Sequence, residues 1–515
     1  MNSLLNGLKN GANFTHTENG AVTHITTRSD LLDMFAMGGA YRKRSDEDCI
    51  LLFKNAFAEN PTYALKCLFY LRDCRGGQGE RRFWRVCAKW AAQNETDAMA
   101  RNLTHVPTFG RWDDLLVFIG TPLESNALEV IKIQLALDVQ CKTPSLLAKW
   151  LPSENTSSFA TRKLAHAVRE YLGMSHKQYR KTLSVLRQRI NVLERLMSEG
   201  RWDEIEFDKI PSRAGMIYKN AFARHDLERA KSEKEVQTYA EFAKDTTKKV
   251  NAKVLYPYEC VAEALKLFRT GSYWSMRDLP KLDDTQRLMV NKYWDNLVDY
   301  FNGASFNGLA VVDTSGSMVG SEPSAPINVA ISLGLYCAEK AKGPFAGHYV
   351  SFASRPQLIA TEGVDFVDKV QRIYKTNLVD NTNIEATFDM LLDTAVRTGC
   401  SQDDLPQNIL VISDMEFDAA TASGWRSNSS IINSRNAETV LEGIARKWAN
   451  YGYQMPHLIF WNVEARQNNI PMLGNGPISY VSGFSPAIFE QIMSGKTGYD
   501  LMMEKLDSER YAPIQ

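Results

Sequence analysis

The sequence has little of what would place it in a membrane, in a secretory pathway or among disulfide-rich proteins. No window approaches the roughly 18 consecutive apolar residues of a membrane-spanning helix. The first 16 residues lack a basic segment followed by an apolar one, so we expect no secretory signal peptide. The eight cysteines form no CxxC pair and have no histidine at ligand spacing. This argues against structural zinc and a disulfide framework and favours the reduced thiols of a cytoplasmic protein.

An excess of charge of one sign is also lacking. The chain has 60 Lys and Arg against 60 Asp and Glu, which argues against a uniformly basic nucleic-acid-binding surface. Residues 1–300 nevertheless have 45 basic and 37 acidic side chains, a net charge of +8, and residues 301–515 have 15 and 23, a net charge of −8. Opposite charges indicate either different partners or attraction between the two regions. At 515 residues, 44% of them hydrophobic, the chain should hold two or three folded domains.

Residues 20–300 are predicted to form a helical-repeat domain. Apolar residues recur there at spacings of three and four, and strand-like alternation is scarce. Gly110-Arg111-Trp112-Asp113-Asp114 recurs as Gly200-Arg201-Trp202-Asp203-Glu204, which indicates stacked helical pairs of the HEAT-like kind or a coincidence. The predicted helices are Leu31–Met37, Asp48–Phe57, Pro61–Arg72, Arg81–Ala92, Leu128–Val139, Thr161–Tyr171, His176–Met197, Lys219–Ala230, Val236–Thr246 and Pro257–Phe268.

Residues 304–515 are predicted to form an α/β domain. Short apolar strands alternate there with helices, which is typical of a doubly wound, mostly parallel sheet with helices on both faces. The predicted strands are Leu309–Val312, Tyr349–Phe352, Asn408–Ile412, His457–Trp461 and Ile478–Val481. The predicted helices are Ala325–Lys340, Asp365–Tyr374, Ile384–Thr398, Ala437–Tyr451 and Pro486–Met493. In such folds, ligands bind at the carboxyl edge of the sheet.

The sharpest local signal is Asp313-Thr314-Ser315-Gly316-Ser317, directly after a predicted strand. The spacing of two puts the carboxylate and both serine hydroxyls on one side of a tight loop. Thr382 and Asp414 follow in other loops at the same edge. Such an all-oxygen set suits a hard divalent ion. The alternative is an ordinary polar turn.

The low number of carboxylates favours docking over catalysis. At most two carboxylates would offset the +2 charge, so the ion could accept an oxygen from an external acidic ligand, whereas a catalytic two-metal site normally has more acidic ligands. Ser315 stands where a haloacid-dehalogenase-type phosphatase needs Asp, and neither Gly-Lys-Ser/Thr nor Gly-x-Ser-x-Gly occurs at this loop. We therefore expect no enzymatic activity.

Several segments resemble known proteins. Three of them resemble the metal loops of a von Willebrand factor A domain with a metal-ion-dependent adhesion site: Leu309–Met318, Thr382–Asp389 and Ile412–Asp418. Together with Phe460–Val463, Arg72–Arg81 and Ile210–Gly215, they resemble an uncharacterised family that joins a helical N-terminal part to such a domain. This architecture is similar to that of Ro ribonucleoproteins, whose TROVE module is a ring of helical repeats closed by the same domain.

The resemblance implies a ring-forming helical module that binds single-stranded RNA ends or small structured RNA. It also implies a cofactor, Mg²⁺ with Mn²⁺ or Ca²⁺ as alternatives, and its ligands would be Asp313, Ser315, Ser317, Thr382 and Asp414. Asp380-Asn381 departs from the pattern, because many such domains have Gly-Gly or Gly-Asn before the threonine. The extra carboxylate would either lower the affinity of the site for an acidic partner or reposition the loop.

Two basic stretches are candidates for contact with RNA phosphates. The candidate residues are Arg75, Arg81, Arg82, Arg85, Lys177, Arg180, Lys181 and Arg187. Phe83, Trp84 and Tyr179 are candidates for base stacking. The alternative is that each basic residue lies on a solvated face of a helix and binds no RNA.

The leading prediction is a cytoplasmic RNA-binding, ribonucleoprotein-like protein whose magnesium site engages an acidic ligand. The alternative is a protein–protein adaptor without an RNA role, in which the metal grips a partner carboxylate.

Overall fold

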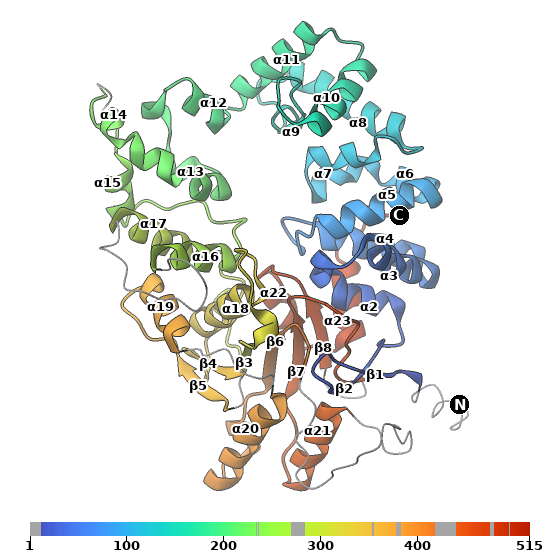
Figure 1. The fold of residues 1–515 in the computed structure, drawn as a ribbon, viewed down its shortest axis with the longest axis vertical. Coiled ribbons are helices and arrows are strands. Elements are labelled where there is room, and N and C mark those ends of the chain that lie inside the picture. The colour runs from blue at the N-terminus through green and yellow to red at the C-terminus, as the bar shows by residue number, and fades with distance from the viewer. Residues whose placement is uncertain are drawn as a thin grey trace. The chain divides into compact units, whose positions relative to one another are not determined.

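The computed structural model describes residues 12–232, 234, 236–268, 284–352, 355–376, 383–417, 439–473, 478–493 and 495–515 (Figure 1). The chain divides into two compact units. The sheet unit comprises Met1–Ala64 and Leu255–Asp507, and the helical unit comprises Leu65–Val254 and Ser508–Gln515. This division differs from the two predicted regions, 20–300 and 304–515, because N-terminal residues and residues 255–303 pack with the sheet.

The sheet unit contains a six-stranded sheet with the strand order β5-β4-β3-β6-β7-β8. Its strands are β3 (Gly308–Asp313), β4 (His348–Phe352), β5 (Gln357–Ala360), β6 (Asn408–Ser413), β7 (His457–Asn462) and β8 (Ile478–Ser482). All neighbours pair in parallel except β4 and β5. The predicted strands are confirmed, because each is a buried apolar run. The exposed edge strand β5 was not predicted, since it lacks such a run.

The order of the strands reverses between β3 and β6. The chain passes from β3 through α18 (Pro326–Lys340) to β4 on one side, and from β6 through α21 (Val440–Asn450) to β7 on the other. Right-handed crossovers in opposite directions put these helices on opposite faces of the sheet, as predicted. Helix α18 packs against β3, β4 and β6, and a Cβ at Gly334 would overlap Val312, so glycine permits the close approach.

Other helices complete the sheet unit. They are α2 (Asp30–Met37), α3 (Asp46–Glu59), α16 (Pro257–Phe268), α17 (Asp284–Asp295), α19 (Phe366–Thr376), α20 (Ile384–Thr398), α22 (Ile488–Ile492) and α23 (Gly498–Leu506). Helix α2 packs against β8. An unpredicted antiparallel hairpin, β1 (Phe14–His16) and β2 (Val22–His24), bridges to the loop after β7 through His24 and Ile470.

The described part of the helical unit is built from helices and short 3₁₀ turns. Its α-helices are α4 (Pro61–Arg72, which begins in the sheet unit), α5 (Arg82–Asn94), α6 (Thr96–Arg101), α7 (Val106–Phe109), α8 (Glu124–Gln140), α9 (Leu147–Trp150), α10 (Phe159–Tyr171), α11 (His176–Arg189), α12 (Leu193–Ser198), α13 (Ser212–Arg224), α14 (Asp226–Ala230) and α15 (Tyr239–Lys244). The predicted helix His176–Met197 is wrong as one element, because it breaks after Arg189 and Asn191 has a positive φ of 48°.

The two copies of the repeated motif both open 3₁₀ helices, η3 (Trp112–Phe118) and η4 (Trp202–Glu204). Trp202 is buried and stacks on His225 with ring centroids 3.9 Å apart, whereas Trp112 is half-buried. The motif therefore specifies a local turn, and its tryptophan is buried in the second copy but only half-buried in the first.

The difference in net charge is larger between the two compact units than between residues 1–300 and 301–515. In the sequence of the helical unit, 34 Lys and Arg stand against 24 Asp and Glu, a formal net charge of +10, which leaves −10 for the sheet unit. Across the described ranges, none of the helices combines the length and apolar character needed to cross a bilayer.

Candidate functional sites

The Asp313 loop closes on itself at the carboxyl end of β3. Asp313 is fully buried, and its Oδ1 accepts a hydrogen bond from the backbone N–H of Ser315 at 2.9 Å. The hydroxyl oxygens of Ser315 and Ser317 are 3.0 Å apart. The loop thus gathers one carboxylate and two hydroxyls, as the spacing predicted.

Asp414 reaches the same place from β6, the parallel neighbour of β3 at the switch point of the sheet. Ser413 connects the two strands, because its hydroxyl donates to Oδ2 of Asp313. Asp414 is 1% exposed, its Oδ1 accepts from the backbone N–H of Glu416 at 3.3 Å, and its Oδ2 has no hydrogen-bond partner. This buried carboxylate oxygen without a hydrogen bond lies at the switch point of the sheet, where α/β folds bind ligands.

Opposing electrostatic effects act on the Asp414 carboxyl. Burial raises the pKa of Asp414, the neighbouring Asp313 carboxylate raises it further, and the Ser317 hydroxyl and the Arg466 guanidinium act in the opposite direction. Two carboxylates this close in a buried site repel each other, and either a proton on one of them or a nearby positive charge relieves the repulsion.

Arg466, which sequence reasoning missed, partly supplies positive charge at this edge. It follows β7, donates from Nη2 to the backbone oxygen of Ser317, and places Nε 3.7 Å from Asp414 Oδ2. Its side chain remains 32% exposed. Nearby, Lys43 Nζ lies 2.8 Å from carboxylate oxygens of both Glu322 and Glu464. The edge is therefore more highly charged than the two predicted carboxylates alone.

Four of the five predicted metal ligands, Asp313, Ser315, Ser317 and Asp414, therefore meet in space. Thr382, with Asp380 and Asn381, lies outside the described residues. Carboxylate and hydroxyl oxygens, among them an Asp414 Oδ2 that makes no hydrogen bond, fit a hard divalent cation. Among the described residues, no group of three or more His, Cys, Asp and Glu side chains has the geometry to hold a metal, so a site here would depend on hydroxyl ligands.

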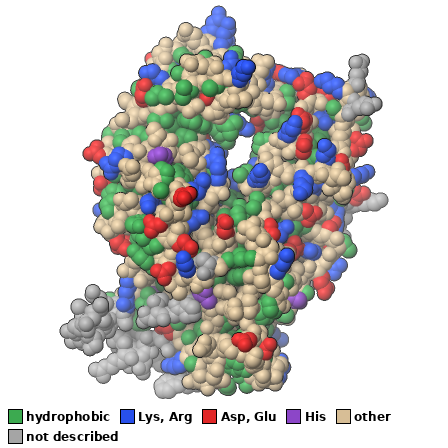
Figure 2. Space-filling model, turned by 180° about the vertical axis from the view of Figure 1, so that it is seen from behind, with side chains coloured by type: hydrophobic (Ala, Val, Ile, Leu, Met, Phe, Trp, Pro, Cys, Tyr) green, Lys and Arg blue, Asp and Glu red, His purple; other side chains and the backbone are tan. Residues whose placement is uncertain are grey.

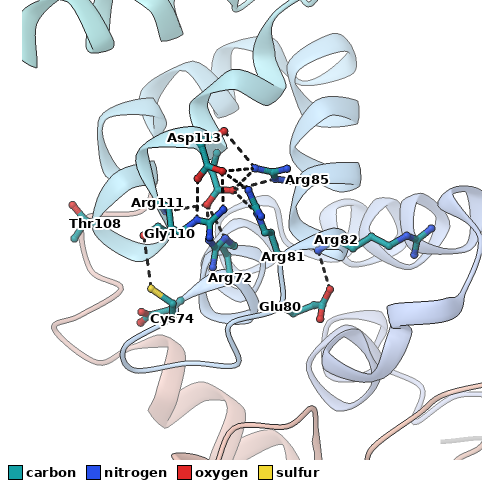
Figure 3. Close-up of polar contacts among 12 residues, drawn as sticks. Arg72, Cys74, Glu80, Arg81, Arg82, Arg85, Thr108, Gly110, Arg111 and Asp113 are labelled. Atoms are coloured by element: carbon teal, nitrogen blue, oxygen red, sulfur yellow. Dashed lines mark hydrogen bonds and ion pairs between the residues drawn. The ribbon is translucent and has the colours of Figure 1, made fainter. Parts of the chain in front are cut away.

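A second charged site lies in the helical unit, where four arginines surround two aspartates (Figure 3). Asp114 is fully buried and accepts hydrogen bonds from Arg72 Nε at 2.9 Å and Nη2 at 2.6 Å. Arg85 Nε adds a third at 3.1 Å. Burial alone would raise the pKa of Asp114, but the guanidinium of Arg72, followed by that of Arg85, holds it below its ordinary value.

Asp113 lies nearer the surface and is shared by three guanidiniums. Arg111 donates to it from Nε at 2.9 Å and from Nη2 at 2.7 Å. Arg81 Nη2 donates to the same carboxylate, and Arg85 Nη2 lies 3.4 Å from it. We name Arg81, Arg85, Arg111 and Asp113 the arginine cluster. Sequence reasoning found Arg81 and Arg85 but missed Arg111, although Arg111 pairs with Asp113 only two residues away. The contacts that bring Arg81 and Arg85 to the same carboxylate join segments some thirty residues apart.

The other RNA candidates separate into engaged and exposed residues. Arg187 does not project freely into solvent as its candidate role requires. It donates to Ala148 O, Leu151 O and Ser153 Oγ at 2.8–2.9 Å, and burial lowers its pKa. Arg75 is exposed and donates to Thr108 O. Figure 3 shows the Arg82 side chain pointing away from the arginine cluster.

Helix α11 carries the remaining candidates on one face. Lys177, Arg180 and Lys181 are exposed, and no ion pair within the described ranges includes them. Lys and Arg side chains stand out at the upper end of Figure 2, where Figure 1 places α10 and α11. The proposed stacking aromatics are wrong: Phe83, Trp84 and Tyr179 are at most 1% exposed, because they face the helical core.

Comparison with known proteins places this combination of a helical unit and a parallel α/β sheet in a family. Residues 17–145 and 138–305 match the family described as Domain of unknown function (DUF2828), and residues 307–511 match Domain of unknown function (DUF7788). The chain belongs to the DUF2828 family. It is 30% identical over 523 residues to Uncharacterized protein L728 of Acanthamoeba polyphaga mimivirus, covering 94% of this chain and 85% of that protein.

Among solved structures, the crystal structure of the Deinococcus radiodurans RO (RSR) protein matches with a TM-score of 0.41 and 13% identity. The match covers 93% of this chain and 99% of that one. Similarity at this level carries no argument about function.

Proposed function

We propose that this protein docks an acidic ligand through a divalent cation at the carboxyl edge of its sheet. The observation that carries the proposal is the buried Asp414 carboxylate, whose Oδ2 lacks a hydrogen-bond partner beside Asp313 and the Ser315–Ser317 hydroxyls. Burying such a pair of carboxylates is costly unless a cation compensates their charge. The cation would lower that cost.

Asp313, Ser315, Ser317 and Asp414 would hold the cation, with Thr382 as the fifth predicted ligand. Mg²⁺ is the favoured ion, with Mn²⁺ and Ca²⁺ as alternatives. When bound, the ion supplies a positively charged coordination position for a carboxylate or phosphate oxygen. At most two carboxylates would offset its charge, whereas a catalytic two-metal site normally has more acidic ligands, and this supports docking of a ligand rather than catalysis.

Cation binding is tested by thermal unfolding of the full chain with increasing MgCl₂. We expect Mg²⁺ to raise the unfolding temperature of the wild type, because a ligand that binds the folded state stabilises it. Asp414→Asn should unfold no earlier than wild type in EDTA, since it removes a repelling carboxylate, and it should lose the response to Mg²⁺. Asp389→Asn, which removes a carboxylate paired with Lys447 at the surface, is the matched control and should keep the response.

The acidic ligand is tested with a fluorescein-labelled oligoglutamate peptide in MgCl₂ and in EDTA. We expect binding that requires Mg²⁺ and is lost in Asp414→Asn. Equal binding in EDTA, or a wild type that does not respond to Mg²⁺, contradicts the proposal.

A second candidate function, RNA binding by the helical unit, is favoured by a separate observation. This unit carries a net charge of +10, and Lys177, Arg180 and Lys181 form an exposed basic face on α11. Such a face can follow a phosphate backbone, because cations one helical turn apart lie next to each other.

Gel-shift titration with a short oligouridylate and with a hairpin RNA tests this function. We expect Lys177→Glu to weaken binding and to lower the salt dependence by roughly 0.7 in the logarithmic slope for a single strand. Lys132→Glu is the control, because Lys132 is also exposed in the helical unit but is paired with Glu129. Wild-type binding without salt dependence contradicts the function.

A further inference from the structure

The arginine cluster, together with the Arg72–Asp114 pair beneath it, has more positive charge than the two aspartates neutralise. Arg72, Arg81, Arg85 and Arg111 contribute +4 and Asp113 and Asp114 contribute −2, so the group has a formal charge of +2. The aspartates lie underneath, with side chains 0% and 16% exposed, whereas the guanidinium-bearing side chains of Arg81, Arg85 and Arg111 are 37%, 34% and 29% exposed. The excess positive charge is therefore at the surface.

The guanidiniums are held in fixed orientations. Arg111 pairs with Asp113 through two nitrogens and lies over the half-buried Trp150 ring at 3.9 Å from its centroid. Arg81 and Arg85 each contact both Asp113 and Asp114. Nη1 of all three takes no part in these contacts. Preorganised donors bind an anion at a lower entropic cost than mobile side chains do.

The positive charges also act on one another. Burial lowers the pKa of Arg81 most, Asp113 opposes it, and the like charges of Arg85 and Arg111 lower the pKa further. A bound anion would relieve this repulsion.

The second copy of the motif provides an internal comparison. Arg201, the counterpart of Arg111, pairs with Glu199 at 2.8 Å and with Glu204 at 2.5 Å. One arginine thus meets two glutamates there, and Arg195 also engages Glu199 at 2.6 Å. Lys234 pairs with Asp203 and Glu204. Three cations therefore balance three anions at this copy, so the excess of positive charge belongs to the first copy and not to the motif.

We infer that Arg81, Arg85 and Arg111 form a binding site for a phosphate group in the backbone of single-stranded RNA. Guanidinium forks match phosphate oxygens in geometry and retain their charge at any physiological pH. A polymeric phosphate fits better than an isolated one, because the whole unit carries +10 and adds the exposed Lys177 and Arg180. This inference rests on the second proposed function, RNA binding by the helical unit.

The test measures fluorescence anisotropy of a labelled oligouridylate with the full-length chain, between about 50 and 200 mM KCl. Arg111→Gln is compared with Arg201→Gln, the matched change in the second motif copy. We expect Arg111→Gln to weaken binding about tenfold and to lower the salt slope, and Arg201→Gln to bind within about twofold of wild type. Arg81→Lys, which keeps the charge but loses the fork, should fall between wild type and Arg111→Gln.

The possible outcomes distinguish a failure of the proposed phosphate site from a failure of RNA binding by the whole helical unit. Wild-type chain without affinity for the oligouridylate refutes the proposed function and this site together. If Lys177→Glu binds the oligouridylate more weakly but Arg111→Gln binds it as tightly as wild type, the site is refuted and RNA binding by the helical unit remains. Equal losses in Arg111→Gln and Arg201→Gln also refute it.

Two further measurements guard against misreading. If Arg111→Gln lowers the unfolding temperature, the affinity of Arg81→Lys for the oligouridylate decides instead. Wild-type affinity in Arg81→Lys overturns the role of the guanidinium fork. Inorganic pyrophosphate is the competitor that identifies the source of the phosphate. If Arg111→Gln loses affinity for pyrophosphate but keeps affinity for the oligouridylate, the ligand is a free phosphate and the backbone assignment is wrong.

Discussion

Arg72 donates two hydrogen bonds, at 2.9 and 2.6 Å, to one carboxylate oxygen of Asp114, and both side chains are almost completely removed from water. The pair joins the end of α4 to η3. The Asp114 carboxylate also accepts from the Arg111 backbone N–H at 2.9 Å. The last residue of the first motif copy is therefore a structural anchor beneath the arginine cluster.

Asp114→Ala should lower the free energy of unfolding of the helical unit by about 3–5 kcal/mol, because it leaves buried Arg72 without its counter-ion. Glu204→Ala makes the corresponding change in the second copy, where the side chain is 37% exposed, and should lower the free energy of unfolding far less. Urea unfolding followed by circular dichroism measures both. Similar losses in the two variants would show that the motif, and not burial, sets the cost.

The C-terminal tail makes a similar contact with Asp73. Asp73 is fully buried and accepts hydrogen bonds from Arg510 and from the hydroxyl of Tyr511, at 2.7 and 2.9 Å. The Tyr511 ring also stacks on Phe109 at 5.5 Å. The tail thus belongs to the core of the helical unit although the sequence places it after the last helix of the sheet unit.

Removal of residues 508–515 should destabilise the helical unit by about 3–5 kcal/mol, since the Asp73 carboxylate loses its charged partner. Asp73→Asn in the shortened chain should recover part of this loss, because an amide carries no charge to bury. Glu509→Ala in the full chain is the control, as Glu509 is exposed. The unfolding temperature reports each change, and a shortened chain as stable as wild type would contradict the role of the tail.

Local patterns predicted the α/β part well. The bounds of the strand Asn408–Ile412 and the helix Ile384–Thr398 were predicted within one residue. A buried strand and an amphipathic helix each have a pattern of apolar residues that is recognisable over a short segment. The meeting of Asp313 and Asp414 followed from topology, since parallel strands end at one edge.

Pairings between distant segments were beyond the reach of the sequence. Arg466 lies about fifty residues after Asp414 and carries no local signal, and the packing of α2 against β8 joins residues more than four hundred apart. Arg187 was misjudged because its helical position gives its direction but not the three acceptors that turn its guanidinium inward.

Arg466→Gln should tighten Mg²⁺ binding, if the proposed cation site is correct. Its guanidinium lies 3.7 Å from Asp414 Oδ2 and repels a cation there. Removing that charge should improve affinity about tenfold, the equivalent of roughly 1.4 kcal/mol. Isothermal titration with MgCl₂ measures the change, and Arg466→Lys, which keeps the charge, should bind as wild type does. Weaker Mg²⁺ binding in Arg466→Gln would contradict this prediction and would show that Arg466 helps to hold the ligands in place instead of repelling the cation.

His457 should make the stability of the sheet unit fall in acid. Burial lowers its pKa, and its Nε2 lies 3.0 Å from Ser479 Oγ. The unfolded chain therefore binds a proton more readily than the folded one, so the contribution of His457 is complete above about pH 6.5 and is lost as the pH falls below it. His457→Gln should flatten the dependence of the unfolding free energy between about pH 8 and pH 5, by at most about 1.4 kcal/mol per pH unit. His16→Gln, at an exposed position of the same unit, should leave the wild-type slope unchanged, and an equal slope in His457→Gln would assign the acid sensitivity to other groups.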